Sequence, residues 1–344
     1  MSERTTRRSI HPRAVLDKIL VDPILGVAVL LIVFAIFAAI ALPVFYAGNN
    51  LFNLLGSSIT VMILAIGVTV VLISGGIDLS VGAVMALAAG AAASAMRLGA
   101  PVFLAFIAAI VVGIAAGLLN GFLVTRVGLP DFIATLSTLG FASGVLYIWT
   151  QGVPIIGYMT PEFRLVGGLQ PLLGPITLPM IIAAVLALII GWLLRSTPLG
   201  TRFFAVGSNA VAARQSGIPV RWVKTQAYIV SGTCAGIAGI ILAGRNNNVP
   251  ADLGTGYEIQ AISAAIIGGA SLMGGRGRVL GAVLGALTLA LAINIINLAG
   301  VPSSFQKIVI GVILLVAVGA NFISDQVRAG VLRRRTAHLA SRAA

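Results

Sequence analysis

Cysteine, histidine and charged residues are all scarce in this chain. Its 344 residues include one cysteine, Cys234, and two histidines, His11 and His338, which lie in the two end segments. A single cysteine excludes a disulfide framework and a cysteine metal site, and two terminal histidines give no basis for histidine metal chemistry or a catalytic triad. Charged residues make up 9% of the chain and hydrophobic residues 59%, which excludes a soluble globular protein.

Lysine is equally rare, and this bears on nucleotide chemistry. The three lysines are Lys18, Lys224 and Lys307, and none lies in a GxxxxGK[ST] phosphate loop. The glycine-rich stretch 274–281 has no strand pattern before it, so it does not predict a phosphate cradle. We therefore expect no ATP or magnesium in this chain, and any energy from ATP must enter through another subunit.

Long runs without charge dominate the sequence. A membrane-spanning helix needs about 20 apolar residues, and the charge-free runs are long enough for ten such helices. We therefore expect an all-α polytopic membrane protein, with helices near 24–45, 51–74, 80–96, 101–125, 131–150, 178–194, 224–243, 258–273, 279–299 and 304–323. The first run lacks a clean small-residue cleavage site, which favours an uncleaved first helix over a signal peptide.

The basic residues are distributed as membrane topology requires. With the Arg-rich N-terminus in the cytoplasm, ten spans place 18 of the 22 basic residues on that side. This asymmetry is a strong positive-inside signal, and it explains the pI near 11.3 without nucleic acid as a partner. We expect a cytoplasmic tail at 1–22, a permease domain at 23–324, and a basic cytoplasmic tail at 325–344, with anionic membrane lipid as a contact.

Two segments of similar pattern indicate an internal repeat. Residues 72–90 and 266–290 both run from an apolar stretch through a Gly-Gly break into a helix of small residues. Five spans in each half would make a duplication an inverted repeat, a frequent transporter architecture. A shared Gly/Ala-rich composition is the alternative explanation.

Small residues spaced four apart recur in the predicted helices. The glycine sets are Gly113/Gly117/Gly121, Gly140/Gly144, Gly232/Gly236 and Gly281/Gly285. Such spacing lets helix backbones approach closely in lipid. We interpret it as packing within the chain in preference to a dedicated dimer seam.

Few polar residues lie within the spans, and they are amides and hydroxyls. Because none of them is ionised, they suit a neutral polar solute such as a sugar better than a charged one, although most would also serve helix packing. Asp78 follows the Gly75-Gly76 break, where either Asp78 or Ser80 can cap the helix that follows. The alternative is a hinge whose aspartate responds to transport state. The candidate translocation residues are Asn53, Ser57, Thr60, Asp78, Asn120, Thr135, Ser137, Thr138 and Asn294.

The loop 195–224 is the one long basic connection between spans. It carries five basic residues and no acid. Ser208 or Asn209 is a good N-cap, and Gly217 with Pro219 ends a helix, so we expect about two helical turns over Ala210–Gln215. Alanine and valine are too small for a helix that rests on lipid, so docking into a protein groove is favoured.

Four segments together resemble one family, and they cover most of residues 50–320. They are GGIDLSVGAVMAL (75–87), GLLNGFLVTRVGLPDFIATLSTLGFASGV (117–145), AVGSNAVAARQSGI (205–218) and YEIQAISAAIIGGASLMGGRGRVLGAVLGA (257–286). The chain resembles a permease subunit of a bacterial ABC sugar importer of the ribose/xylose/galactose type, related to branched-chain amino-acid permeases. Two positions depart from that pattern, since Asp131 replaces an apolar or proline residue and Gln260 stands where an acid is common.

The resemblance implies partners and a coupling site. The implied partners are a cytoplasmic ATP-binding subunit, a periplasmic substrate-binding protein and a second permease chain, in the bacterial inner membrane. It also implies that 205–218 is the coupling helix, with contacts at Gly207, Ser208, Asn209, Ala212, Ala213, Ser216, Gly217 and Ile218.

Other functions remain open at this point. They are a branched-chain amino-acid or nucleoside ABC permease, an ion-coupled secondary transporter, and a structural membrane protein. For the coupling site, we expect Gly207→Trp or Ala212→Glu to leave membrane insertion intact and to weaken retention of the ATPase.

Overall fold

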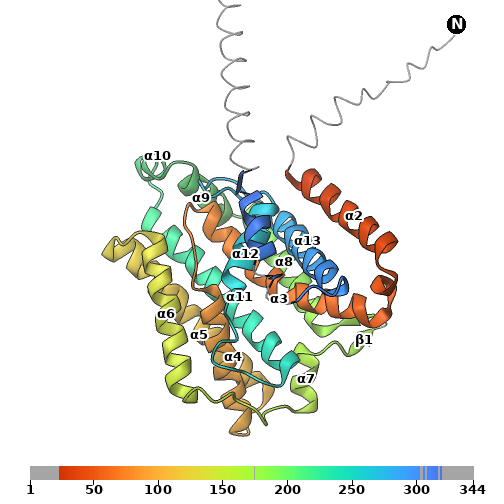
Figure 1. Cartoon of the computed structure of the whole chain (residues 1–344). Helices are drawn as coiled ribbons and strands as arrows, with labels where there is room; N and C mark the ends of the chain where they lie inside the picture. Colours follow the sequence, from red (N-terminus) through yellow and green to blue (C-terminus); the bar gives the residue numbers. More distant parts are fainter. Residues whose placement is uncertain (1–22, 174, 303–304, 307, 317, 320–344) are drawn as a thin grey trace, which may run out of the picture.

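The structure is a computed structural model that describes residues 23–173, 175–302, 305–306, 308–316 and 318–319. Most of this part of the chain is helical, and the helices pack side by side into one body (Figure 1). The predicted tails, 1–22 and 325–344, lie outside the described residues.

Among the described residues, seven helices are long and apolar enough to cross a membrane. Two shorter apolar helices, α4 (Val81–Arg97) and α12 (Tyr257–Ile267), complete the body. The described residues of the tenth predicted span, 305–306, 308–316 and 318–319, are also helical. A multi-pass all-α membrane protein is thus confirmed, while the count of ten and the side of the termini stay predictions. The seven long helices are α2 (Pro23–Ala41), α3 (Gly48–Ile73), α5 (Val102–Phe122, continued by the π-helical turn η2, Leu123–Val127), α6 (Asp131–Thr150), α8 (Leu178–Ser196), α11 (Val220–Asn246) and α13 (Val279–Leu298).

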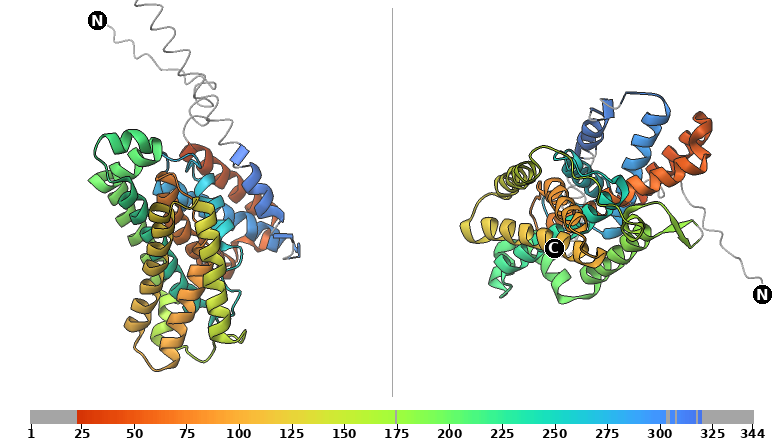
Figure 2. Two further views of the ribbon diagram at one scale, coloured as in Figure 1. Left: turned by 90° about the vertical axis from the view of Figure 1, so that its left-hand side faces the viewer. Right: turned by 90° about the horizontal axis from the view of Figure 1, so that it is seen from below.

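Helices α3 and α11 form the centre of the body. Their most apolar windows are 89% and 78% buried, whereas those of α2, α5 and α8 are 11%, 22% and 22% buried. Helix α11 packs against α3, α4 and α5, and the views in Figure 2 show the other helices arranged around this centre. An apolar helix inside such a ring needs no polar face, which is why the charge-free runs carry no clear amphipathic pattern.

Glycines allow a close helix crossing between α5 and α11. A Cβ at Gly113 would overlap the carbonyl of Gly232, and one at Gly236 would lie 2.5 Å from the carbonyl oxygen of Ala109. Packing within the chain is therefore confirmed for these glycines. For Gly140 and Gly144 on α6 the same prediction is wrong, since no described atom lies within 4 Å of a Cβ built at either position.

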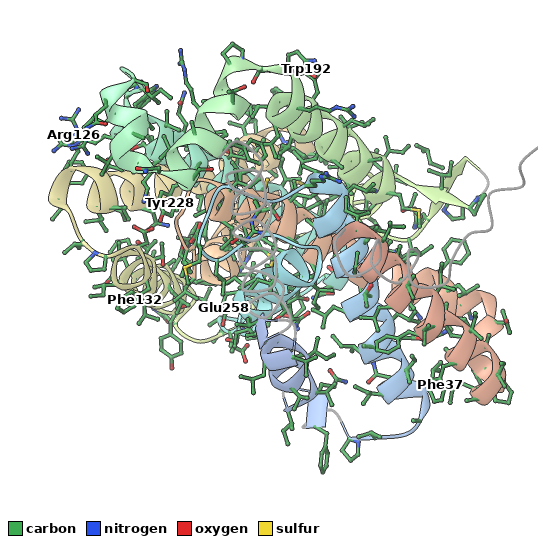
Figure 3. The ribbon with its side chains drawn as sticks, turned by 90° about the horizontal axis from the view of Figure 1, so that it is seen from above. Phe37, Arg126, Phe132, Trp192, Tyr228 and Glu258 are labelled. Carbon is green, nitrogen blue, oxygen red and sulfur yellow. The ribbon has the colours of Figure 1, made fainter. Side chains whose placement is uncertain are left out.

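Large apolar side chains cover the outside of the peripheral helices. Phe37 on α2 is 56% exposed and Trp192 on α8 is 63% exposed, and both point away from the body (Figure 3). Exposed apolar surface on this scale is incompatible with water but suits lipid chains, since each helix satisfies its own backbone hydrogen bonds.

Two non-helical segments interrupt the body and make α4 and α12 short. One is 74–80, between α3 and α4, and the other is 268–278, between α12 and α13. The predicted helix 258–273 is too long, because Gly269 adopts a φ of +87° and the helix ends at Ile267. Both segments contain a glycine pair, as the proposed repeat requires, but the repeat itself stays a prediction.

The connection 151–177 contains regular structure of its own. It contains the short helix α7 (Pro161–Gly167), which Thr160 caps by accepting from the Phe163 N–H at 3.2 Å. An antiparallel pair of strands follows, β1 (Pro171–Leu173) and β2 (Ile176–Thr177). The Tyr158 hydroxyl donates to the Ala243 carbonyl at 2.9 Å, and burial raises the pKa of Tyr158 well above its ordinary value.

Candidate functional site

The basic loop forms two short helices at one end of the body. They are α9 (Pro198–Ser208) and α10 (Ala210–Gln215), and α7 lies at the opposite end (Figure 1). Thr197 caps α9 by accepting from the Gly200 N–H at 3.2 Å. The sequence predicted α10 with its bounds but missed α9, and it treated 205–218 as one element.

Asn209 separates the two helices and begins the second. Its backbone is extended, with φ −160° and ψ 99°, and its side-chain oxygen accepts from the N–H groups of Val211 and Ala212, each at 3.0 Å. Gly217, with φ +80°, follows α10 and reverses the chain. Asparagine is a preferred N-cap and glycine a preferred C-terminal residue, so both ends of α10 are fixed locally.

Most of the predicted coupling residues face outward. Ser208, Asn209, Ala212, Ser216 and Gly217 are exposed. Gly207 and Ile218 are half-buried, and Ala213 is only 5% exposed. The helix α10 therefore presents one small, mostly uncharged surface outward, while Ala213 packs on the body.

Gly207 anchors α9 against the end of α3. A Cβ at Gly207 would overlap the carbonyl oxygen of Ile73 and would lie 2.7 Å from the nitrogen of Gly275. The same carbonyl accepts from the Gly275 N–H at 2.9 Å. Three segments that are distant in sequence, 73–75, 207–208 and 274–275, therefore meet here. We call this meeting point the glycine seam.

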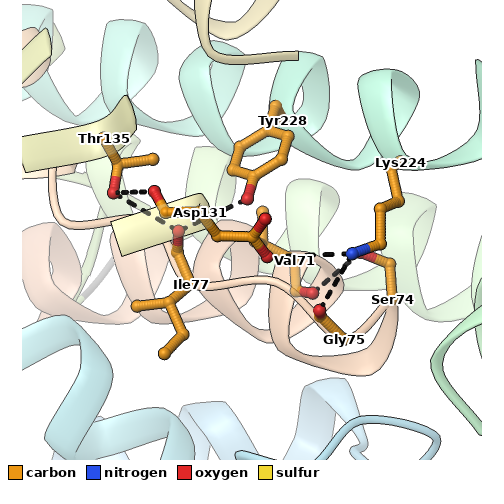
Figure 4. A network of polar contacts seen from close by, with 8 residues as sticks. All are labelled: Val71, Ser74, Gly75, Ile77, Asp131, Thr135, Lys224 and Tyr228. Carbon is orange, nitrogen blue, oxygen red and sulfur yellow. Dashed lines mark hydrogen bonds and ion pairs between the residues drawn. The ribbon is translucent and has the colours of Figure 1, made fainter. Parts of the chain in front are cut away.

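A polar network lies next to the glycine seam (Figure 4). The Lys224 ammonium donates to the Gly75 carbonyl at 3.1 Å and lies 3.8 Å from Oδ2 of Asp131. The two side chains of this ion pair are 22% and 21% exposed. The contact joins α11, α6 and the non-helical segment after α3.

The same network holds the next residues of that segment. The Ile77 carbonyl accepts from the Tyr228 and Thr135 hydroxyls, each at 3.4 Å. A Cβ at Gly76 would lie 2.8 Å from the Tyr228 oxygen and 3.1 Å from Oδ2 of Asp131. Only a glycine fits between these two groups without displacing one of them.

Asp78 lies in a second, fully buried polar cluster. Its Oδ1 accepts from the Ser80 N–H at 3.0 Å and the Ser80 hydroxyl at 2.6 Å, and its Oδ2 accepts from Ser231 at 2.8 Å. Asn120 donates to the Ser80 hydroxyl at 2.8 Å. Ser80 occupies the N-cap position of α4 without a side-chain cap bond, so capping by Ser80 is wrong. Asp78 binds the Ser80 N–H just before the helix.

Among the described residues, the candidate translocation residues do not share one hydrogen-bond network. Asp78 and Asn120 share the buried cluster, while Thr135 is bonded to the Ile77 and Asp131 carbonyls. Asn294 exchanges hydrogen bonds with Asn50, at 2.7 and 3.2 Å, which is a contact between α13 and α3. Three of the predicted residues are exposed, namely Asn53, Ser57 and Ser137.

Some buried oxygens have no hydrogen-bond partner in the part of the chain described. They are Oδ1 of Asn120 and the hydroxyls of Thr60 and Thr138, together with those of Thr177 and Ser263. Unpaired buried polar atoms are costly. Thr60 and Thr138 were both candidate translocation residues, and their role stays a prediction.

Sequence reasoning missed the partners of Asp131. Asp131 was noted only as a departure from a family pattern, and Lys224 only as part of a basic loop. Lys224 and Tyr228 are four residues apart on α11 and therefore share one helix face, which was a usable signal. Their contact with segment 74–80 is a tertiary feature that spacing could not show.

The comparisons with known proteins point in one direction. A family model described as "branched-chain amino acid transport system / permease component" matches residues 50–318. The ribose import permease protein RbsC of Escherichia coli (strain K12) is 39% identical over 291 residues, which are 84% of this chain and 90% of that protein. The ribose import permease protein RbsC of Bacillus subtilis (strain 168) is 38% identical over 316 residues, 92% and 96% of the two chains. The autoinducer 2 import system permease protein LsrC of Salmonella typhi is 37% identical over 258 residues, 74% and 72%.

Proposed function

The chain belongs to the family of branched-chain amino-acid transport system permease components, and on that premise we propose that it is the membrane-spanning permease of an ATP-driven sugar importer. A separate cytoplasmic ATP-binding subunit would supply the energy. The solute would be a pentose or a related small polar molecule, and the site of action the bacterial inner membrane.

The observation that carries this proposal is the α9–α10 pair. It is capped at both ends, it presents an exposed surface of small residues, and it is joined to the end of α3 through the glycine seam. A partner that moved α10 would therefore displace an element connected directly to the central helix. Such a rigid connection is what a subunit without its own phosphate loop needs in order to use the hydrolysis of ATP by another subunit.

The class of solute is supported by two kinds of observation. The relatives include ribose import permeases and an autoinducer 2 import permease. The candidate translocation residues other than Asp78 are uncharged, and the Asp78 carboxylate is 1% exposed and held by Ser80 and Ser231. Neutral hydroxyl and amide groups suit a polyhydroxylated solute. A periplasmic binding protein would supply most of the selectivity.

A second permease chain and a periplasmic binding protein are the remaining partners. The observation that supports a second permease chain is that two candidate translocation residues, Asn53 and Ser57, lie exposed on α3. We propose that a second permease chain completes the translocation path. A loaded binding protein would dock at the α7 end, and closure of the ATP-binding subunits would move α10 at the other end.

Reconstitution tests the proposal directly. The chain is co-expressed with the ATP-binding subunit encoded next to it, purified, and placed in proteoliposomes that enclose ATP. Radiolabelled ribose is added with the adjacent exported binding protein. We expect uptake that requires ATP and persists when a protonophore collapses the ion gradients. Uptake that needs no ATP and stops with the protonophore would show an ion-coupled secondary transporter.

A branched-chain amino-acid permease is the second candidate, because the matching family model carries that description. Competition separates the two solute classes. In the same vesicles, unlabelled leucine should leave ribose uptake unchanged. Uptake of labelled leucine without uptake of any tested sugar would favour the second candidate.

A further inference from the structure

We infer that Lys224 and Asp131 are positioning residues that transmit the movement of α10 to the segment 73–77 at the end of α3. The inference rests on the proposed function, since it assumes that a partner moves α10. It assigns a task to an ion pair of which the sequence marked only Asp131, as a departure from the family pattern.

The segment 73–77 is held from two sides by one continuous stretch of chain. On one side, Gly207 of α9 packs against the Ile73 carbonyl. On the other side, Lys224 of α11 donates to the Gly75 carbonyl at 3.1 Å. Helix α10 lies between these two contacts in the sequence, so a displacement of α10 pulls on both of them.

The contact with Asp131 adds a third element. Asp131 is the first residue of α6, and Oδ2 lies 3.8 Å from the Lys224 nitrogen. Thr135, one turn later on α6, donates to the Ile77 carbonyl at 3.4 Å, as does Tyr228 of α11. The first turns of α6 and the residues Lys224 and Tyr228 of α11 therefore contact the same short segment. The ion pair joins the two helices to each other (Figure 4).

The regular helix ends within this segment. Ile73 is the last residue of α3, Gly75 adopts a φ of +74°, and residues 76–80 carry neither helix nor strand. Asp78, the residue after Ile77, is bonded to Ser231 in the interior at 2.8 Å. A shift of 73–77 would therefore reach the buried cluster at the start of α4, which contains two candidate translocation residues, Asp78 and Asn120.

A purely structural ion pair is the competing explanation. Removing such a pair would lower the stability of the permease but leave the number of solute molecules moved per ATP unchanged. A positioning role predicts instead that the ATP-binding subunit stays bound and that ATP hydrolysis continues, while transport falls. The ratio of uptake to phosphate release therefore separates the two explanations.

The experiment measures uptake and phosphate release in the same proteoliposomes of the complete importer. The variants are Lys224→Met and Asp131→Asn, with Lys224→Arg as the conservative change. Arg221→Met is the matched control, because Arg221 is exposed on the same turn of α11. We expect the ratio to fall at least about fivefold in the first two variants, the lower end of typical coupling effects. Lys224→Arg should restore most of it, and Arg221→Met should leave it unchanged.

Unchanged ratios in Lys224→Met and Asp131→Asn would overturn the inference, and so would an equal fall in the control. If Lys224→Met does not fold, Tyr228→Phe is the alternative, because it removes a single hydroxyl bond to the same segment. The ratio should fall in this variant too, and an unchanged ratio would overturn the inference. Failure of the proposed function is distinguishable, because the wild-type complex would then show no ATP-driven uptake at all.

Discussion

Substitution of Gly207 by alanine is the sharpest test of the seam that supports α9 and α10. The added Cβ would lie 2.7 Å from the Gly275 nitrogen and closer still to the Ile73 carbonyl oxygen. Ordinary contacts are about 3.5 Å, so α9 must move away by at least about 0.8 Å. Overpacking of this kind costs about 1–3 kcal/mol. Weakening the hydrogen bond from Gly275 to Ile73 costs about a further 1–3 kcal/mol.

The assay is thermal unfolding of the purified permease in detergent, followed by tryptophan fluorescence. A loss of about 2–6 kcal/mol should lower the midpoint by at least about 4 °C. Gly140→Ala is the matched control, because no described atom lies within 4 Å of a Cβ at that position on α6. Alanine is favoured over glycine inside a helix by about 0.5–1 kcal/mol, so the control should unfold no earlier than the wild type. Equal midpoints for Gly207→Ala and the wild type would refute the reasoning.

Four further outcomes are expected. Ala212→Glu changes an exposed residue of α10, so unfolding should shift by less than about 0.5 kcal/mol while co-purification of the ATP-binding subunit falls; full retention of that subunit would count against docking. Asn209→Ala removes the cap of α10 and should cost about 0.5–2 kcal/mol, with faster backbone hydrogen exchange over 210–215 as the local readout. Gly113→Leu overlaps the Gly232 carbonyl and should abolish folding, seen as aggregation on size-exclusion chromatography; a monodisperse protein would contradict the close crossing of α5 and α11. Ser231→Ala removes a donor to the buried Asp78 carboxylate and should cost about 1.5–3 kcal/mol, a loss that thermal unfolding would detect and that Ser137→Ala, at an exposed residue, should not show.

The apolar framework could be predicted from the sequence because lipid imposes it. Helices that cross a membrane must be long and uncharged, so each predicted span falls on a helix of the structure, apart from the residues beyond the described part. Helix α12 was the poorest prediction, since the apolar run continues past Ile267 and only the Gly268-Gly269 pair marks its end. Helix α9 was missed because Gly200 and Gly207 lower its intrinsic helix propensity, whereas tertiary contact at both glycines supports it.

The helix α10 could be predicted from the sequence, whereas the tertiary contacts of the neighbouring helix α9 could not. Asn209 and Gly217 are local signals, so they fixed the bounds of α10 without any tertiary information. The role of Gly207 depends on Ile73 and Gly275, which no spacing along the chain connects. A change such as Gly207→Trp would therefore disturb the fold and the docking surface together, and Ala212→Glu is the cleaner test of docking.

Some of the polar residues could likewise be picked out from the sequence, whereas others are evident only from tertiary contacts. Asp78 was singled out because a carboxylate in an apolar sequence is unusual, and it lies in a buried cluster with Ser80 and Ser231. Ser231 carried no signal of its own, because a lone serine in an apolar helix is ordinary. Lys224 and Asp131 are separated by many residues, so their contact emerges only because α11 and α6 both pack against the segment that follows α3.

The central claim is that the ATP-binding subunit binds α10, and site-directed crosslinking tests this claim most directly. In a Cys234→Ala background, Ala212→Cys places a reactive thiol on α10, and Trp149→Cys places one near the end of α6 that lies away from it. Membranes containing the complete importer are treated with a lysine-to-thiol crosslinker. We expect a covalent adduct between position 212 and the ATP-binding subunit, and none from position 149. ATP-driven uptake with no adduct from position 212 would contradict the account.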